Sequence, residues 1–369
     1  MRPAFSSTQQ AAAFALLLLA LLALPVVIGK NLLPPREQAY ITQSWTFNPY
    51  PWFRYQFFQE QGDIDIAFVG SSHMANAIDA RYVQAKLSEK LGRPAVVRLF
   101  GWGGSGYDAL YFISRDLLAH RRVRLLVFYD ENPIGRNRCN QATFLFRWGE
   151  DAGLISNLPL ADQGLFYFGS IIGMPRNLLT HFRSNLSGRV VLNAGSWQIL
   201  DYAPHSTNQL DDLPEVEGFA FHKTMSGEPF VPFTPPLSMV QQEALCYSAN
   251  TKTNFAISTS PLPAWQIHFA RLFADLAHKK NVNIAMLYLP VWPELHETVI
   301  PERTFWPAIF GDDLTQIGIP PAKSFNGLTE SEILKMYGEQ YHLNLNGQQY
   351  FTHLITPALL KLYEDSTNH

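Results

Sequence analysis

Beyond residue 62, short apolar runs alternate with segments of helical periodicity. Three runs have the length and apolar content of buried strands: 64–69, 95–100 and 124–130. Between the first two, apolar residues recur every four positions and are followed by Gly92, which predicts a helix over 79–91. Strands that alternate with helices are typical of a parallel sheet covered on both faces. The expected fold class is therefore α/β, with a doubly wound, flavodoxin-like parallel sheet.

This alternation is interrupted between about 133 and 260, and it resumes afterwards. The interrupted region is rich in proline and aromatic residues, and we interpret it as one long insertion. A helix is predicted at 263–280 and a strand at 282–290. A last helix is expected to begin near Gly347 and to be bent by Pro357.

The chain begins with a strongly apolar segment. Residues 11–29 carry no charge, and about 20 such residues span a bilayer as a helix. Arg2 precedes the run, so a cleaved signal peptide is the alternative. The run is longer than the usual core of a signal peptide, however, and no small-x-small cleavage site follows it. We therefore expect a tail at 1–10, a transmembrane anchor at 11–29 and a membrane-proximal linker at 30–62.

Composition narrows the class of protein. The chain has 369 residues and is 47% hydrophobic, so we expect one large domain at 63–369 that includes the insertion. A formal net charge of −3 without a basic run argues against nucleic acid as a partner. Cys139 and Cys246 either form one disulfide or remain two buried thiols. Asp130 and Glu131 have no further ligand at metal-binding spacing, so we expect neither a metal nor another cofactor.

Polar residues and glycines follow the three predicted strands at the edge where a parallel sheet binds ligands. Ser72 stands between the first strand and the next helix, where its hydroxyl can be exposed. Gly104 and Gly106 follow the second strand and allow the backbone to approach a ligand, and Asn132 follows the third. The backbone N–H groups of Ser72 and Gly106, with the Asn132 amide, would form an oxyanion hole for acyl transfer.

A serine nucleophile also needs a base, which in such sites is a histidine held by a carboxylate. Of the 11 histidines, His342 is the best candidate, because it lies just ahead of the last helix and Glu339 precedes it by three residues. On a loop this spacing lets the carboxylate reach the far imidazole nitrogen and fix the tautomer.

Each of these residues also has a simpler interpretation. Ser72 could be a helix N-cap, and His342 an exposed loop residue. Asn132 and Gly106 could only shape turns, with Gly104 competing for the donor role. Ser71 is assigned to the turn. His73 is expected to line the substrate site or to be structural, because the side chains of neighbouring residues diverge.

The segments "VGSSHM", "GGSGYDAL", "YDEN" and "EQYHLNLNG" together resemble the four sequence blocks of the SGNH (GDSL-like) hydrolase superfamily. The resemblance is greatest to its membrane-anchored, envelope-facing members, which act in teichoic-acid D-alanylation and polysaccharide O-acetylation. It implies these roles: nucleophile Ser72, base His342, and oxyanion donors Gly106 and Asn132. Two positions depart from the pattern, because Glu339 and Ser71 stand where the hydrolases usually have aspartate.

The resemblance implies two-step acyl transfer through an acyl-enzyme, with the hydroxyl of an envelope polysaccharide as acceptor. It also implies a multi-pass membrane partner that exports acyl groups, and a place on the bacterial inner membrane with the domain facing the periplasm or exterior. One alternative is an esterase that transfers the acyl group to water. Another is a non-catalytic carbohydrate-binding or assembly component. Aromatic residues of the insertion could stack on sugars, although most such rings belong to cores: Trp197, Tyr202 and Phe233.

Overall fold

The computed structural model divides the chain into two compact units. One consists of residues 1–43 and 140–193, and the other of residues 44–139 and 194–369. The residues whose structure is described are 5, 7–31, 36–40, 50–129, 142, 145–170, 224–225, 231, 246–247, 255–256, 262–298, 300–301, 309–310 and 314–367.

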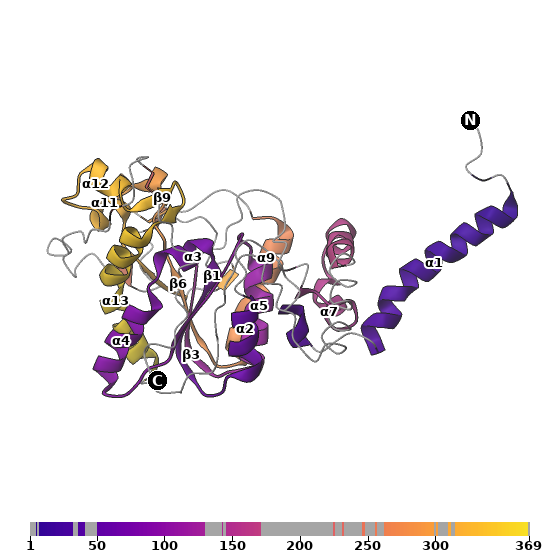
Figure 1. Ribbon diagram of the computed structural model, residues 1–369, viewed down its shortest axis with the longest axis horizontal. Coiled ribbons are helices and arrows are strands. Elements are labelled where there is room, and N and C mark those ends of the chain that lie inside the picture. Colours follow the sequence, from indigo (N-terminus) through magenta and orange to yellow (C-terminus); the bar gives the residue numbers. More distant parts are fainter. Residues whose placement is uncertain are drawn as a thin grey trace. The chain divides into compact units, whose positions relative to one another are not determined.

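Among the described residues, the larger unit contains a six-stranded sheet in the order β2-β1-β3-β6-β8-β4. Its strands β1, β3 and β6 are labelled in Figure 1. The strands are β1 Ile64–Ser71, β2 Val97–Trp102, β3 Val123–Tyr129, β6 Asn283–Leu287, β8 Thr315–Gly318 and β4 Cys246–Tyr247. The first five run parallel, and β4 lies antiparallel to β8. Numbered along the chain, the parallel strands follow the order 2-1-3-4-5 of a doubly wound sheet. The α/β prediction is confirmed.

Helices cover both faces of this sheet (Figure 1). Helices α4 (Ala80–Leu91) and α13 (Leu345–Thr367) contact each other on one side, and α5 (Tyr107–His120) and α9 (Ala264–Lys279) contact each other on the other. On the first side, Phe68 and Val127 share a core with residues of α13. Phe128, the next residue along β3, packs edge-on against Phe273 of α9 instead. Both faces of the strands are therefore buried, which explains their continuous apolar runs.

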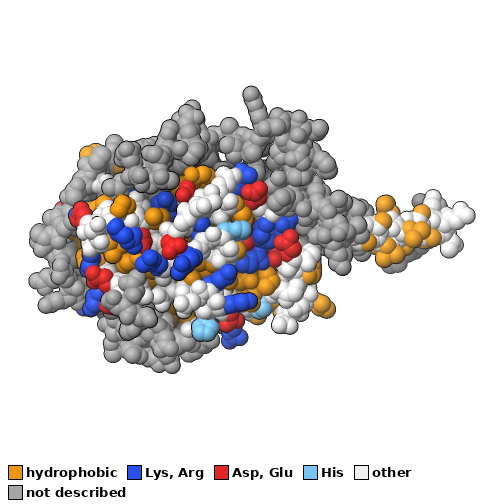
Figure 2. All heavy atoms as spheres, turned by 90° about the horizontal axis from the view of Figure 1, so that it is seen from below, with side chains coloured by type: hydrophobic (Ala, Val, Ile, Leu, Met, Phe, Trp, Pro, Cys, Tyr) orange, Lys and Arg blue, Asp and Glu red, His pale blue; other side chains and the backbone are white. Residues whose placement is uncertain are grey.

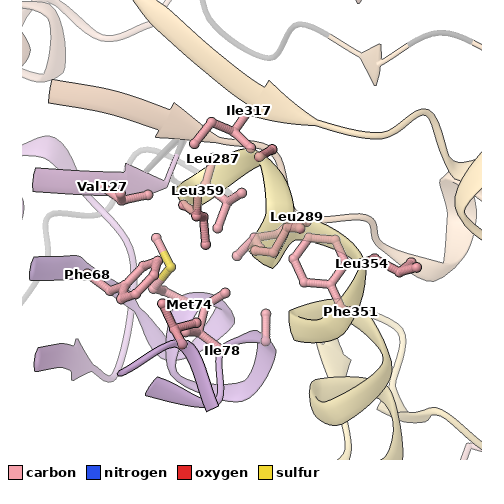
Figure 3. Packing of buried hydrophobic residues seen from close by; sticks show 14 of the residues in the cluster. Phe68, Met74, Ile78, Val127, Leu287, Leu289, Ile317, Phe351, Leu354 and Leu359 are labelled. Carbon is pink, nitrogen blue, oxygen red and sulfur yellow. The ribbon is translucent and has the colours of Figure 1, made fainter. Parts of the chain in front are cut away.

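Local hydrogen bonds and a glycine define both ends of α4, and Gly92 ends the helix as predicted. The Asp79 side chain accepts hydrogen bonds from the backbone N–H groups of Arg81 and Tyr82, and Gly92 ends the helix in the left-handed conformation with φ 63°. The preceding short helix, α3 (Ser72–Ala77), approaches β2 closely, since a Cβ on Gly101 would lie 2.5 Å from the Cβ of Ala75. In Figure 3, Met74 and Ile78 lie close to Phe68 in the core.

Smaller elements complete the larger unit. They are α2 Tyr50–Arg54, the π-helical turn η2 Tyr55–Gln59, β5 Phe255–Ala256, η8 Trp292–Glu294, β7 Ile300–Pro301, α11 Pro321–Ser324, α12 Glu330–Leu334, β9 Tyr337–Glu339 and β10 His342–Leu343. Short β5 pairs with β7, and β9 pairs with β10.

Part of the predicted linker belongs to the folded unit. Phe53 of α2 and Phe57 of η2 are buried, and their ring centroids lie 5.5 Å and 5.0 Å from that of Phe100 in β2. These aromatic residues fill the core beside β2, so the folded unit includes 50–59 and does not start at Asp63. An aromatic run has the same composition whether it contacts a membrane interface or a protein core, which is why sequence did not separate the two.

The smaller unit contains α1 (Thr8–Asn31), the 3-10 helix η1 (Arg36–Tyr40), α7 (Trp148–Ile155) and a helical segment at 160–170. Arg36 binds the carboxylate of Asp151 in α7 at 3.4 Å.

Within the part of the chain that the structure describes, no helix is both long and apolar enough to cross a membrane. The transmembrane anchor predicted at 11–29 is thus not found, although these residues are helical.

The surface carries charges of both signs. On the face shown in Figure 2, lysine and arginine side chains are interspersed with aspartate and glutamate. Exposed ion pairs in the larger unit join Lys86 to Glu89 at 2.9 Å and Lys90 to Glu364 at 2.8 Å. Such exposed pairs contribute little to stability.

A buried carboxylate ties together elements at the start of β1. Asp65 is 3% exposed and accepts hydrogen bonds from Arg93 at 2.6 Å, from the Tyr363 hydroxyl at 2.5 Å and from the Val96 N–H at 2.8 Å. Burial acts to raise the pKa of Asp65, but these hydrogen bonds outweigh it and bring the pKa below its usual value. The folded state therefore favours the ionised carboxylate.

We expect Asp65→Asn to lower the free energy of unfolding by about 2 kcal/mol at neutral pH, because hydrogen bonds to a charged group are lost. Since the folded-state pKa is depressed, this contribution is present above the unfolded pKa and is lost as the pH falls through the folded pKa. Urea unfolding across pH should thus show the variant and the wild type converging in acid. Glu89→Gln, in an exposed pair, is the control; an equal effect of Asp65→Asn at every pH would contradict the account.

Candidate active site

The nucleophile candidate lies at the carboxyl end of β1. Ser71 occupies the N-cap position of α3 without a side-chain capping bond, and Ser72 is the first helical residue. Strand β1 lies between β2 and β3, so the chain changes direction along the sheet at this point. Doubly wound sheets bind ligands at such a switch point. The hydroxyl of Ser72 does not cap the helix; it contacts His342 instead.

The candidate base and its carboxylate lie on a small hairpin. His342 of β10 pairs with Glu339 of β9 across a two-residue turn, which places their side chains next to each other. His342 Nε2 lies 2.8 Å from the Oγ of Ser72, 270 residues away in the sequence. The Nδ1 of His342 is hydrogen-bonded to Glu339 Oε1. The structure therefore brings together all three residues predicted for catalysis, with a hairpin in place of the expected loop.

Buried contacts fix this hairpin to the loop after β6. The phenol of Tyr337 is buried and donates a hydrogen bond to the carbonyl of Pro290 at 3.1 Å, and burial raises its pKa. The N–H of Trp292 donates to the carbonyl of Gln340, in the turn of the hairpin, at 2.9 Å. The two contacts therefore fix the position of the hairpin that carries His342.

Helix α13 begins directly after the hairpin and is capped by a buried side chain. The Oδ1 of Asn344 accepts hydrogen bonds from the N–H groups of Asn346 and Gly347. The backbone at Gly347 lies so close to that at Met336 that a Cβ on Gly347 would be 2.2 Å from the carbonyl oxygen of Met336. The predicted helix is confirmed, and it begins two residues earlier than expected.

The same helix holds the segment that carries Ser72. Gln348 donates side-chain hydrogen bonds to the carbonyls of Ala75 at 3.0 Å and Ile78 at 3.2 Å. Thr352 donates to the carbonyl of Ala77 at 3.1 Å. Sequence reasoning missed Asn344, Gln348 and Thr352, because a polar residue looks the same in sequence whether it faces solvent or a buried backbone. Gln348 and Thr352 attach the segment of α3 to α13, and Asn344 caps the start of α13 after the hairpin.

His73 departs from the expectation that its side chain diverges from the catalytic one. Its ring lies 4.6 Å from that of His342, at an interplanar angle of 88°. Its Nδ1 lies 3.1 Å from the hydroxyl of Tyr129, at the end of β3. Consecutive helical side chains point about 100° apart, so two of them can touch a group that lies over the first turn of a helix. Both Ser72 and His73 therefore contact His342.

The glycine turn follows β2 at the same edge of the sheet. Trp102, the last residue of β2, is in register with Ser71. Gly104 has φ 81°, a backbone conformation that glycine adopts readily and other residues rarely adopt. Gly106 is the N-cap of α5, and the next N–H, that of Tyr107, donates to the buried side chain of Gln266 at 2.6 Å. Gln266 thus anchors the turn, a role that the sequence did not reveal.

Several predicted residues lie outside the described part of the chain: Asn132, Asp130, Glu131, Cys139, Trp197, Tyr202 and Phe233. The side chain of Cys246 is likewise not described, although its backbone is part of β4. Among the residues that are described, no group of three or more His, Cys, Asp or Glu side chains could hold a metal ion.

A serine, a histidine and a carboxylate in this order can activate a hydroxyl for attack on a carbonyl carbon. The histidine side chain is 16% exposed and that of Glu339 is 42% exposed, so the arrangement lies near the surface. Comparison of the sequence with models of known protein families gives no match, and comparison with curated proteins finds no similar sequence.

Proposed function

We propose that this protein is an SGNH-type serine acyltransferase that moves an acyl group onto a hydroxyl of a cell-envelope polysaccharide. The observation that carries the proposal is the hydrogen bond of 2.8 Å between Ser72 Oγ and His342 Nε2, with Glu339 bound to the other ring nitrogen. The strand order supports an SGNH fold, because the nucleophile follows the first strand of a 2-1-3-4-5 sheet.

The proposed reaction has two halves. In the first, His342 takes the proton of Ser72 as Oγ attacks the carbonyl carbon of an ester or thioester. The leaving alcohol or thiol then departs with the proton from the imidazolium, and an acyl ester remains on Ser72. In the second, the acceptor hydroxyl gives its proton to His342 and attacks that ester, and the proton returns to Ser72.

The negative oxygen of each tetrahedral intermediate needs hydrogen-bond donors. We propose the backbone N–H groups of Ser72 and Gly106 and the side-chain amide of Asn132. The positions of Ser72 and Gly106 at the start of α3 and at the N-cap of α5 support this, since backbone N–H groups at helix starts point towards the ligand edge.

The acceptor, the acyl donor and the cellular location belong to the same proposal. A polymer hydroxyl can reach a triad near the surface, and the exposed carboxylate of Glu339 is consistent with such a site. The resemblance to envelope acyltransferases supports an outward-facing protein supplied by a multi-pass membrane partner. If water is the acceptor, the protein is an esterase; a non-catalytic assembly component is the remaining alternative.

The product of the second half distinguishes these functions. The full-length protein is incubated with p-nitrophenyl acetate, with and without de-O-acetylated xylan, and the Ser72 peptide is analysed by mass spectrometry. We expect an acetyl group on Ser72 and, with xylan present, acetyl esters on the glycan. Free acetate as the only product in both conditions would favour the esterase. Failure of Ser72 to become acetylated would contradict the enzymatic proposal.

A further inference from the structure

We propose that His73, held by Tyr129, is a positioning residue that fixes the ring of the base His342. This inference rests on the proposed function, because a positioned base matters only if Ser72 reacts. It assigns a role to a side chain that belongs to neither the triad nor the oxyanion donors. Its basis is the perpendicular contact of the two imidazole rings and the hydrogen bond that holds His73 from behind.

The hydrogen bonds of His342 leave one degree of freedom weakly restrained. His342 is hydrogen-bonded at Nδ1 and Nε2. Because hydrogen bonds to imidazole nitrogens are directed along the ring plane, such bonds set the direction of the ring but restrain its tilt weakly. The Glu339 side chain is also 42% exposed, so water competes for the carboxylate. A second ring at 88° and 4.6 Å opposes that tilt by direct contact.

His73 is in turn attached to a rigid part of the fold. Tyr129 is the last residue of β3 and is 3% exposed, and its hydroxyl lies 3.1 Å from His73 Nδ1. Tyr341, in the turn of the hairpin, lies nearly parallel to the His73 ring at 6.2 Å and 8°. His73 therefore lies between the end of a buried strand and the hairpin that carries the base.

Because His73 is next to Ser72 in the chain, its ring contact with His342 links the base to the nucleophile. His73 directly follows Ser72 in the first turn of α3, whereas His342 comes from a different element. Any contact between His73 and His342 therefore restrains the base relative to the nucleophile itself. Displacing a catalytic group by about 1 Å can lower a rate by about 100-fold, so such a restraint should affect turnover.

The ring contact and the hydrogen bond can be separated by substitution. His73→Phe keeps an aromatic ring and loses the bond to Tyr129, whereas His73→Asn keeps a nitrogen near the Nδ1 position and loses the ring. We expect His73→Asn to lower kcat for p-nitrophenyl acetate by about 10- to 100-fold with a small change in KM, and His73→Phe to retain more activity. Tyr129→Phe as a single substitution should lower kcat. Added to His73→Phe it should have no further effect, because the hydrogen bond between the two residues is already lost.

The control is a second stacked histidine outside the site. His353 of α13 stacks on Tyr82 with ring centroids 3.8 Å apart, and His353→Asn removes this contact without touching the triad. Its kcat should remain that of the wild type. Additive effects of Tyr129→Phe and His73→Phe, or an unchanged kcat in His73→Asn, would overturn the proposal.

A readout that does not depend on turnover separates this inference from the proposed function. Nitrogen NMR of full-length protein labelled at histidine reports the tautomer and environment of the His342 ring, identified with His342→Gln. Changed His342 signals in His73→Asn, with no acylation of the wild type at Ser72, would retain the positioning role and reject the acyltransferase. Acylation of the wild type with unchanged signals in the variant would reject the positioning role alone. A merely structural role would lower the melting temperature of His73→Asn and leave the His342 signals in place.

Discussion

Ser72→Ala is expected to lower the acylation rate with p-nitrophenyl acetate by about 10⁴-fold or more, because it removes the hydroxyl that attacks in the proposed reaction. The hydroxyl of Ser72 is 2.8 Å from the base, a distance at which its proton can be transferred as it attacks. The measurement is the burst and steady-state release of p-nitrophenol by full-length protein. Residual turnover would reflect binding and oxyanion stabilisation alone.

Ser71→Ala is the matched control for this prediction. Ser71 is adjacent, 2% exposed and at the N-cap of α3, yet its side chain makes no capping bond to the helix. Because Ser72 is the serine whose hydroxyl contacts His342, the variant should keep most of the activity, and mass spectrometry should still find the acyl group on Ser72. If Ser71→Ala lost activity and Ser72→Ala kept it, the nucleophile would be Ser71.

His342→Ala is expected to have the second largest effect, a loss on the order of 10⁴-fold in kcat/KM for acylation. Without the imidazole, the proton of Ser72 has no acceptor at Nε2, and the leaving group has no acid. The variant should still fold, since the hairpin is held by the buried Tyr337 and by backbone bonds that do not involve this ring. Acylation rates are compared after thermal unfolding has verified the fold.

Glu339→Gln should cost less, about 10²-fold, at the lower end of the range for general acid–base groups. Glu339 is half-exposed, so the charge that it offers to the imidazolium is partly screened by water. The fold-loss of activity in His342→Ala should therefore be about 100 times larger than the fold-loss in Glu339→Gln. An acylation rate that His342→Ala leaves unchanged would exclude His342 as the base, whatever the result for Glu339→Gln.

Local signals were sufficient for the secondary structure around the site. The strand at 64–69 and the helix at 79–91 were predicted because an apolar run, an apolar residue at every fourth position and a terminal glycine act over a few residues, whereas the Asp79 cap was seen only in the structure. Residues 50–59 were interpreted as a linker because aromatic composition does not say what the rings contact. Their packing against Phe100 depends on a strand about 45 residues further on, which only the folded chain brings near.

For the candidate site, the sequence by itself determined the candidate residues: a serine after the first strand, a histidine before the last helix and a carboxylate three residues from it. Few types of side chain can perform acyl-transfer chemistry, and each of these three residues lies near the end of a predicted strand or helix. Only the tertiary structure decided that Ser72 meets His342 across 270 residues, that His73 packs on the same ring, and that Gln348 fixes α3 from α13. The physical reason is that local patterns encode an element and its buried face, whereas distances between side chains depend on how the elements pack.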